Sequence, residues 1–517
     1  MSPAPDASNL LVLTPLRIEA RAVQRGAPGA DVRHIGMGAR RAARGVDAVR
    51  DAAAQATVLA GLCGALQPDL RPGDVVLASE IHGPAGVIAC ADPSVLAGAL
   101  RRGGLNVHVG PIASSSGVVI GQRRRDLQRT GALAVDMESA WVLPALPDRC
   151  AVVMRVVMDT PSHELYRPLR ALAALTAARR SLSRAAEVAD EWARAVRPRE
   201  IVLASPRASC AGVLRAVEAV RRALSERGAP IYVRKQIVHN AHVVADLERQ
   251  GAHFVEELDE VPAGATVIFS AHGVSPAVRI EAAERSLDVI DATCPLVSKV
   301  HAEARRYAAA DFDIVLVGHA GHEEVEGTLG EAPERIQLIA GPDEVGAVRV
   351  RDPEKVAYLT QTTLAVDDTA AVVEALHERF PAVAGPSTSD ICYATQNRQD
   401  AVRSLAEECQ MILVVGSRNS SNSRRLVEVA ERAGCPARLI DGASEIPVEC
   451  LTGCDRVGVT AGASAPEELV QDVVRALQSM GGASVRELTV ASEDIHFKLP
   501  AELRARGSAQ PTRKEVT

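Results

Sequence analysis

Aromatic residues are scarce in this chain, with Phe, Tyr and Trp together making up 2% of its 517 residues. Hydrophobic residues nevertheless total 47%, so the core must be built mainly from Ala, Val and Leu. With 24% charged residues, the composition is that of a soluble globular protein. The chain is too long for one ordinary domain, and we expect two or more.

Lysine is also rare, since only five of the 58 Lys and Arg residues are Lys, and the net charge is −7. This balance argues against a protein that binds nucleic acid or a membrane surface. No apolar run reaches the roughly 18 to 20 residues that span a bilayer. The first residues, MSPAPDASNLLVLTP, lack the basic segment of a secretory signal. We therefore expect a cytoplasmic protein.

The sequence contains ten cysteines but no CxxC pair. In a cytoplasmic chain, cysteines are expected to be metal ligands, nucleophiles or packing residues rather than disulfides. A structural zinc site usually uses four ligands with paired spacing. Cys450 and Cys454 lie four residues apart without a second pair, so they are weak candidates for such a site.

Three other cysteines each follow an apolar run and stand at the mouth of a loop: Cys210 in IVLASPRASC, Cys294 in DVIDATC and Cys392 in TSDIC. Three isolated thiolates suit a [4Fe–4S] cluster in which one iron has no protein ligand. We predict that these three residues hold such a cluster, and that the remaining seven cysteines are packing residues.

Two blocks restart with a buried-strand pattern, the first at NLLVLTP and the second at IVLASP. In both, Val/Ile/Leu runs alternate with helical stretches, which predicts α/β folds with mostly parallel sheets. We place one domain at 1–198, a second at 199–506 and a disordered tail at 507–517. The three cysteines are 84 and 98 residues apart, which suggests three similar α/β lobes, each bringing one cysteine to the centre.

Several loops of the second block lead from a strand into a helix and are rich in hydroxyl and amide side chains. Helix starts offer free N–H groups and a positive dipole end, so these loops suit an anion with several oxygens, such as a diphosphate. The alternative is that Ser and Asn only cap helices. The candidate ligand residues are Ser420, Ser421 and Asn422 in GSRNSSNS, Ser464 in TAGASAP, and His239, His272 and His322.

Two more polar groups have chemical interest. Glu324 follows His322 by two residues, and a carboxyl buried beside a cluster has a raised pKa and can deliver protons. Thr362 in TQTTL offers a hydroxyl able to bind a substrate hydroxyl or relay a proton.

Residues 200–500 resemble the 4-hydroxy-3-methylbut-2-enyl diphosphate reductases, the IspH/LytB family. The motifs that carry the resemblance include CAGV, IFSAHGVS, DATCPLV, VGHAGHEEVEGT, TQTTL, DICYATQNRQ, VVGSRNSSNS and EDIHFKLP. One departure is Ala208-Ser209, where the family more usually has Gly-Phe. The resemblance implies that the three cysteines hold the cluster, that the histidines, Ser420, Ser421, Asn422 and Ser464 bind the diphosphate, that Glu324 delivers protons and that Thr362 positions the substrate hydroxyl.

The same resemblance implies reductive removal of that hydroxyl, giving isopentenyl and dimethylallyl diphosphate at the end of the methylerythritol phosphate route. Electrons would come from a ferredoxin or flavodoxin. The alternative for the whole chain is a redox sensor that carries a cluster and a nucleoside-binding regulatory module.

The first block resembles the purine nucleoside phosphorylase/nucleosidase superfamily through GLCGALQPDLRPGDVV, GALAVDMESA and VVMRVVMDTP. The resemblance implies that Met137 and Glu138 hold a ribose, that Asp159 protonates the leaving base and that Glu19 activates water. The alternative is that these carboxylates cap helices or pair with Arg. We thus expect a phosphorylase-like α/β domain fused to a three-lobed α/β iron–sulfur domain.

Overall fold

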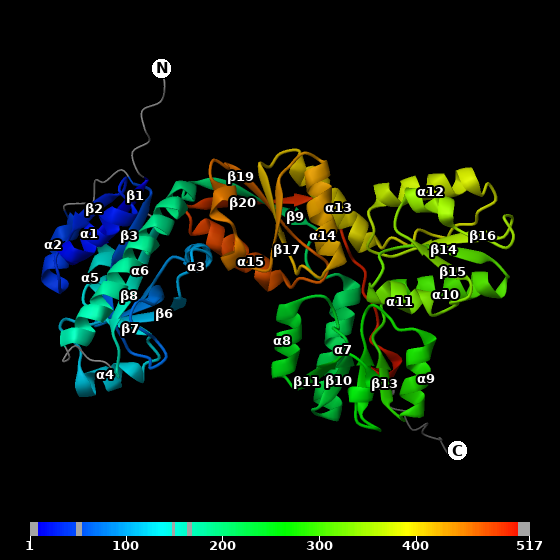
Figure 1. Ribbon diagram of the computed structural model, residues 1–517, viewed down its shortest axis with the longest axis horizontal. Coiled ribbons are helices and arrows are strands. Elements are labelled where there is room, and N and C mark those ends of the chain that lie inside the picture. Colours follow the sequence, from blue (N-terminus) through cyan, green and yellow to red (C-terminus); the bar gives the residue numbers. More distant parts are fainter. Residues whose placement is uncertain (1–8, 48–53, 147–149, 163–167, 505–517) are drawn as a thin grey trace, which may run out of the picture.

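The computed structural model describes residues 9–47, 54–146, 150–162 and 168–504. The predicted disordered tail, 507–517, lies outside the described residues. Figure 1 shows an elongated molecule with the first block at one end and three lobes beyond it. Among the described residues, no helix combines the length and apolarity needed to cross a membrane.

The first block is built on an eight-stranded mixed sheet in the order β2-β1-β3-β7-β6-β4-β5, with β8 pairing with β3 and β4. Five of its strand pairs are parallel and three are antiparallel. The strands are β1 (Leu10–Thr14), β2 (Asp31–His34), β3 (Ala56–Ala65), β4 (Val75–Gly83), β5 (Gly86–Ala89), β6 (Val107–Ser114), β7 (Ala134–Asp136) and β8 (Cys150–Asp159).

Helices flank this sheet, and the long helix α6 packs against α1, α3 and β8. The helices are α1 (Arg17–Gly26), α2 (Ala39–Asp47), α3 (Ser94–Arg102), α4 (Gly121–Gln128), α5 (Ser139–Val142), the short 3-10 helix η1 (Leu143–Ala145) and α6 (Pro168–Ala195). The boundary predicted at residue 198 falls between α6 and the next strand, β9.

The second block contains three separate sheets, and all their strand pairs are parallel, as apolar runs between helices predict. We call them the first, second and third lobes. The first lobe has β10 (Ile231–Arg234), β11 (Ala252–Val255), β12 (Thr266–Phe269) and β13 (Asp288–Asp291). The second has β14 (Asp313–Val317), β15 (Ile336–Ile339) and β16 (Val356–Thr360). The third has β9 (Arg199–Ser205), β17 (Met411–Val415), β18 (Ala437–Ile440), β19 (Arg456–Ala461) and β20 (Ala483–Thr489).

Each helix of the second block except α13 begins a short loop after the carboxyl end of one of these strands. They are α7 (Ala211–Arg227), α8 (Ala241–Arg249), α9 (Pro276–Glu284), α10 (Pro295–Ala309), α11 (Glu323–Leu329), α12 (Val366–Arg379), α13 (Tyr393–Ala406), α14 (Ser421–Arg432) and α15 (Glu467–Gln478). Short 3-10 helices are η2 (Leu258–Glu260), η3 (Pro342–Ala347), η4 (Ala443–Glu445), η5 (Val448–Leu451) and η6 (Ala501–Leu503).

The two blocks share one hydrophobic core. Trp192 and Val196 at the end of the first block belong to the same buried cluster as Leu451 and Leu477 of the third lobe. Arg102 of α3 donates hydrogen bonds to the carbonyls of Ser444 and Ile446, at 2.9 and 2.8 Å. The first block is therefore packed rigidly against the third lobe rather than tethered by a loose linker.

Candidate active site

A cavity of about 110 Å³ is lined by loops from all three lobes. All twelve site residues predicted for the second block line it: Cys210, His239, His272, Cys294, His322, Glu324, Thr362, Cys392, Ser420, Ser421, Asn422 and Ser464. Eight of them stand in loops that leave the carboxyl ends of parallel strands, where α/β folds collect their ligand groups. Glu324, Ser421 and Asn422 lie in the first turns of the helices that follow such loops, and Cys392 lies between helices α12 and α13. The structure thus brings this part of the predicted site together.

Each of the three cysteines occupies the N-cap position of a helix: Cys210 before α7, Cys294 before α10 and Cys392 before α13. A helix N-terminus favours a thiolate because its free N–H groups and dipole carry positive charge. The Cys392 sulfur accepts a hydrogen bond from the Thr395 backbone N–H at 3.2 Å. Without a bound cation, burial outweighs this effect and raises the pKa of Cys294 to about 12 and that of Cys392 to about 11.

The space beside the thiols fits an iron–sulfur cluster. A Cβ on Gly212 would lie 2.8 Å from the Cys294 sulfur and 3.8 Å from the Cys210 sulfur, so the glycine keeps a volume open between them. A single metal ion needs ligand atoms that lie close together. Within the described residues, the side chains whose ligand atoms all lie within 4.8 Å of one another are His239, His272 and Glu323, and the three cysteines do not form such a group. The three thiols are therefore spread more widely than the ligands of a single ion, as a multi-iron cluster requires.

Three imidazole rings form a second group in the cavity. His239 and His272 stack with their ring centroids 4.1 Å apart, and His322 meets both edge-on at 5.5 and 5.9 Å. Burial, followed by the neighbouring His272, lowers the pKa of His239 to about 3 and that of His322 to about 4. Two of the three rings are thus neutral at physiological pH in the absence of an anion.

The hydroxyl and amide groups lie at the starts of α14 and α15. Ser420 is the N-cap of α14, and its Oγ accepts from the Ser423 N–H at 3.3 Å. Ser464 Oγ lies 3.3 Å from Ser420 Oγ, which joins the two loops. Asn422 is 5% exposed, and neither its Oδ1 nor its Nδ2 has a partner among the described residues. Capping accounts for Ser420, whereas the Asn422 amide lines the cavity and is available to a ligand bound there.

Glu324 lies in α11 and is 3% exposed. Its Oε1 accepts a hydrogen bond from the Thr362 backbone N–H at 2.7 Å, and its Oε2 accepts from the Thr362 hydroxyl at 3.1 Å. Burial raises the pKa of Glu324, although both hydrogen bonds oppose the shift. A buried carboxyl whose pKa is raised keeps its proton to a higher pH than a free one and can deliver it to a ligand in the cavity.

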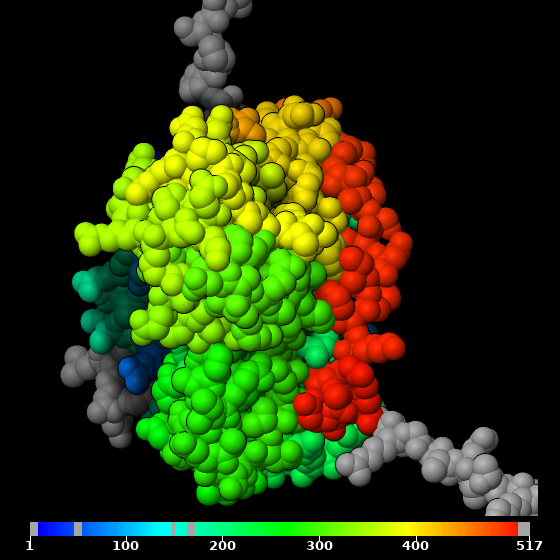
Figure 2. Space-filling view, turned by 90° about the vertical axis from the view of Figure 1, so that its right-hand side faces the viewer, coloured from blue at the N-terminus to red at the C-terminus, as the bar shows by residue number. Residues whose placement is uncertain are grey.

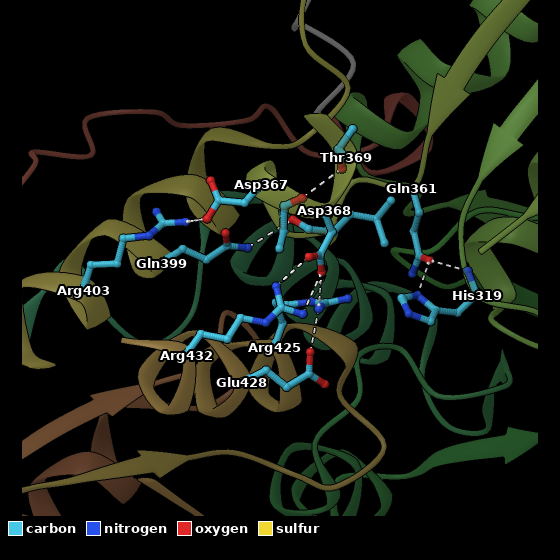
Figure 3. A network of polar contacts seen from close by, with 12 residues as sticks. His319, Gln361, Asp367, Asp368, Thr369, Gln399, Arg403, Arg425, Glu428 and Arg432 are labelled. Carbon is cyan, nitrogen blue, oxygen red and sulfur yellow. Dashed lines mark hydrogen bonds and ion pairs between the residues drawn. The ribbon is translucent and has the colours of Figure 1, made fainter. Parts of the chain in front are cut away.

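An ionic contact fixes α14 against the second lobe. Asp368 of α12 lies between Arg425 and Arg432 of α14, and its Oδ2 is 2.7 Å from Arg425 Nη1 (Figure 3). Arg425 is 9% exposed and also pairs with Glu428. This contact positions the Ser420–Asn422 loop relative to Thr362 and Glu324.

The C-terminal segment crosses the lobes and reaches the cavity. Figure 2 shows residues after β20 running down one side of the molecule over the other lobes. Phe497 of this segment lines the cavity, and Glu493 pairs with the buried Arg398 at 2.9 Å. Arg398 also donates to the carbonyl of Ala208, which has a φ of 59°, where glycine is favoured. Arg398 therefore supports the unusual Ala208-Ser209 turn before Cys210.

Sequence reasoning missed several contacts. Thr395 supports Cys392, a role that its position three residues after an N-cap would have indicated. Glu323 pairs with His272, with Oε2 and Nδ1 3.1 Å apart. No local pattern links residues 51 positions apart, so that pair could not be predicted from the sequence.

A second cavity, of about 190 Å³, lies in the first block and is lined by all four residues predicted there: Glu19, Met137, Glu138 and Asp159. Glu19 is 2% exposed and accepts from the N–H groups of Leu16 and Leu62 at 2.7 and 2.8 Å. Burial raises the pKa of Glu19 to about 7, so it exchanges a proton near neutral pH. This is the range in which a general base works best.

Two buried arginines pair with the acids of this second cavity. Arg155 is fully buried and contacts Asp136 at 2.7 Å and Glu138 at 3.6 Å. Glu138 also accepts from the Gly38 N–H at 3.0 Å, and burial raises its pKa. Arg124 Nη1 lies 2.6 Å from Asp159 Oδ2. The alternative that these carboxylates pair with Arg therefore holds for Asp159 and Glu138, although both still line the cavity.

Comparisons with known proteins identify both blocks. Residues 201–478 match the model of the family described as LytB protein, and residues 23–194 match the model described as Phosphorylase superfamily. Both predicted resemblances and the predicted fold class are confirmed.

Two relatives carry the name 4-hydroxy-3-methylbut-2-enyl diphosphate reductase. The one from Leifsonia xyli is 59% identical over 307 residues, which cover 59% of this chain and 91% of the relative. The one from Xanthomonas campestris is 57% identical over 312 residues, covering 59% and 99%. The solved E-1-hydroxy-2-methyl-but-2-enyl-4-diphosphate reductase of Plasmodium falciparum is 37% identical with a TM-score of 0.58, and the match covers 59% of this chain and 97% of that one.

Proposed function

Because the chain belongs to the LytB family, we propose that it reduces (E)-4-hydroxy-3-methylbut-2-enyl diphosphate to isopentenyl and dimethylallyl diphosphate. The observation that carries this proposal is the single cavity that joins three N-cap thiols, three imidazoles, unpartnered Asn422 and buried Glu324. Such a reaction needs three sets of groups: thiols that hold a cluster, groups that bind the diphosphate anion, and a proton donor. A redox sensor would need the cluster but not the other two sets.

Cys210, Cys294 and Cys392 would hold a [4Fe–4S] cluster and leave one iron without a protein ligand. When bound, such a cluster supplies electrons and a Lewis-acidic iron next to the substrate. The overall reaction uses two electrons and two protons and releases the hydroxyl as water. Since the chain needs an outside electron source, we infer a ferredoxin or flavodoxin as its partner.

The diphosphate would lie against the starts of α14 and α15, facing Ser420, Ser421, Asn422 and Ser464, with the histidines on its other side. The helix starts supply N–H groups and positive dipole ends, and the buried amide of Asn422 supplies a donor that now lacks a partner. Anchoring the diphosphate holds the hydroxyl end of the substrate towards the thiols. The hydroxyl is then held next to the groups that react with it, which lowers the entropic cost of bringing them together.

Glu324 would deliver a proton to the leaving hydroxyl or to the carbon chain, and Thr362 would orient that hydroxyl. Both Thr362 groups that contact Glu324 fix its carboxyl in place. Because the Thr362 N–H donates to Oε1, the proton of the acid would sit on Oε2. The Thr362 hydroxyl, 3.1 Å from Oε2, would then accept from that proton instead of donating. The raised pKa of Glu324 supports this role because burial favours the protonated acid over the carboxylate.

The proposal is tested with the full chain, reconstituted with iron and sulfide without oxygen and supplied with a reduced ferredoxin or a chemical reductant. Conversion of the hydroxylated diphosphate to the two isoprenoid diphosphates, measured by mass spectrometry, is the expected result. A reconstituted protein that holds iron but forms neither product contradicts it.

For the first block we propose a second function, the cleavage of a nucleoside. The observation that favours it is that Glu19, Met137, Glu138 and Asp159 meet in one cavity. Glu138 would bind the ribose hydroxyls and Glu19 would activate water. Asp159 would give the leaving base its proton, and Arg124, 2.6 Å away, would stabilise the carboxylate that this transfer leaves.

This second function is tested by incubating the full chain with adenosine and 5′-methylthioadenosine and following the release of free adenine. Adenine release that Glu19→Gln abolishes is expected. Binding without release from either nucleoside would instead indicate a regulatory module.

A further inference from the structure

Glu323 stands directly behind one of the cavity histidines. It is the first residue of α11, and its Oε2 lies 3.1 Å from His272 Nδ1 and 3.4 Å from the Ser270 hydroxyl. Both side chains of the pair are largely buried, with 16% of Glu323 and 15% of His272 exposed. His272 lines the cavity, whereas Glu323 does not. The contact occupies Nδ1 and leaves Nε2 as the ring nitrogen available to a ligand.

The other two rings of the cavity have no such partner. His322 Nδ1 accepts a hydrogen bond from the Glu324 N–H at 3.2 Å, which requires an unprotonated Nδ1. His239 Nδ1 has no partner among the described residues. Among these three rings, His272 is the one that contacts a carboxylate.

The charges around the pair agree with this arrangement. Burial opposes ionisation of Glu323, but the hydrogen bond and charge of His272 hold its pKa below its usual range. The charged and titratable groups that act on Glu323 or His272 are His239, His322, Lys235 and Glu324, and Arg424 acts on His239 and His322. His239 and His322 are the neutral imidazoles, Lys235 and Arg424 are cations, and Glu324 is a buried carboxyl held by Thr362. Glu323 is the carboxylate that contacts the His272 ring.

We propose that Glu323 is a positioning residue that keeps His272 doubly protonated, so that the ring presents an N–H to the substrate diphosphate. A neutral ring that gives its Nδ1 proton to Glu323 would turn the lone pair of Nε2 towards the phosphate oxygens. A ring held between a carboxylate and a diphosphate donates to both only as the cation. This inference rests on the proposed reductase function, because it assumes a diphosphate in the cavity.

The test compares Glu323→Gln with the full-length holoenzyme. Calorimetry gives the Kd of inorganic diphosphate, and steady-state assays give KM and kcat, at about pH 6 and about pH 8. We expect Glu323→Gln to raise Kd and KM roughly tenfold at about pH 8, where a charged hydrogen bond is replaced by a neutral one. At about pH 6 the rise should be under about threefold, because the solvent then supplies the proton. The value of kcat should stay within about twofold, since Glu323 does not touch the reacting atoms.

A matched control and a rescue variant accompany it. Glu326→Gln removes a carboxylate from the same helix that is 54% exposed and pairs with Lys235, and it should leave Kd unchanged. Glu323→Asp keeps the carboxylate and should recover most of the affinity at the higher pH. If Glu323→Gln does not fold, Glu323→Asp carries the test with a smaller rise in Kd that again disappears at the lower pH.

An equal loss of affinity at both pH values, or a loss confined to kcat, overturns the proposal. A wild-type protein that binds inorganic diphosphate but does not reduce the substrate contradicts the proposed function instead. The pH dependence of diphosphate binding would still decide the role of Glu323 in that case.

Discussion

Replacing Glu324 with Gln removes one proton from the cavity while changing little else. The carboxyl accepts from the Thr362 N–H at 2.7 Å and from the Thr362 hydroxyl at 3.1 Å. A Gln amide can keep the first contact through its oxygen and reverse the second by donating to the hydroxyl. Because both contacts survive, we expect the free energy of unfolding to change by less than about 1 kcal/mol.

The loss of the proton should appear in kcat. A positioned acid contributes about 10²- to 10⁴-fold to a rate, or about 3 to 5 kcal/mol of barrier. We therefore expect Glu324→Gln to lower kcat by at least about 10²-fold while KM changes by less than about threefold. In the wild type, burial raises the pKa of Glu324. Activity should accordingly fall as rising pH removes this proton.

The assay measures iron content, the visible absorption of the cluster, kcat and KM on the same preparation. Glu326→Gln, an exposed carboxylate on the same helix, is the control and should behave as wild type. Turnover that remains within about threefold of wild type would remove Glu324 as the proton donor. Loss of iron together with turnover would instead show that Glu324 supports the fold of the cavity.

Three further predictions concern other parts of the chain. Cys294→Ala should abolish the visible absorption of a reconstituted cluster. The control Cys435→Ala, which changes a cysteine in the core of the third lobe, should keep that absorption. An intact absorption band in Cys294→Ala would contradict the assignment of Cys294 as a ligand. The pKa of Glu19 rises from 4.5 to about 7 on folding, so its contribution to stability is fully present below pH 4.5 and is lost as pH rises through 7. The loss amounts to about 3 kcal/mol, and melting temperatures of Glu19→Gln should show a flatter pH dependence than wild type. A Cβ on Gly98 would lie 1.7 Å from the Ser444 carbonyl, so Gly98→Ala should destabilise the junction of the two blocks by roughly 2 to 3 kcal/mol, and an unchanged melting temperature would refute that close packing.

Local pattern was sufficient to find most of the reductase site. Cys210 and Cys294 each follow an apolar strand and precede a helix, and the loops with Ser420 and Ser464 repeat that design. Cys392 also precedes a helix, but it follows helix α12 and a coil segment, so the expectation of a strand before it is wrong. Strand, loop and helix signals span fewer than about fifteen residues, so they can be read from neighbouring positions alone. The parallel sheets then require these loops to gather at the carboxyl ends of their strands.

The pairing of charges could not be predicted in the same way. The sequence predicts that Asp159 protonates a leaving base or, alternatively, pairs with an Arg, and it does not indicate which Arg. The structure assigns Arg124, which is 35 positions away and 3% exposed. Which of 53 arginines reaches a given carboxylate depends on how the helices pack on the sheet, and no local spacing encodes it.

The sequence by itself determined the two α/β blocks, the positions of the thiols and anion-binding loops, and both family resemblances, because these depend on short-range periodicity and on residue type. Only the tertiary structure decided that the blocks share one core through Trp192 and Leu477, and that Glu323 lies behind His272. It also decided that Asn422 is buried with no partner among the residues that the structure describes. These are contacts between residues far apart in the chain, and their distances and burial arise only when the lobes pack together.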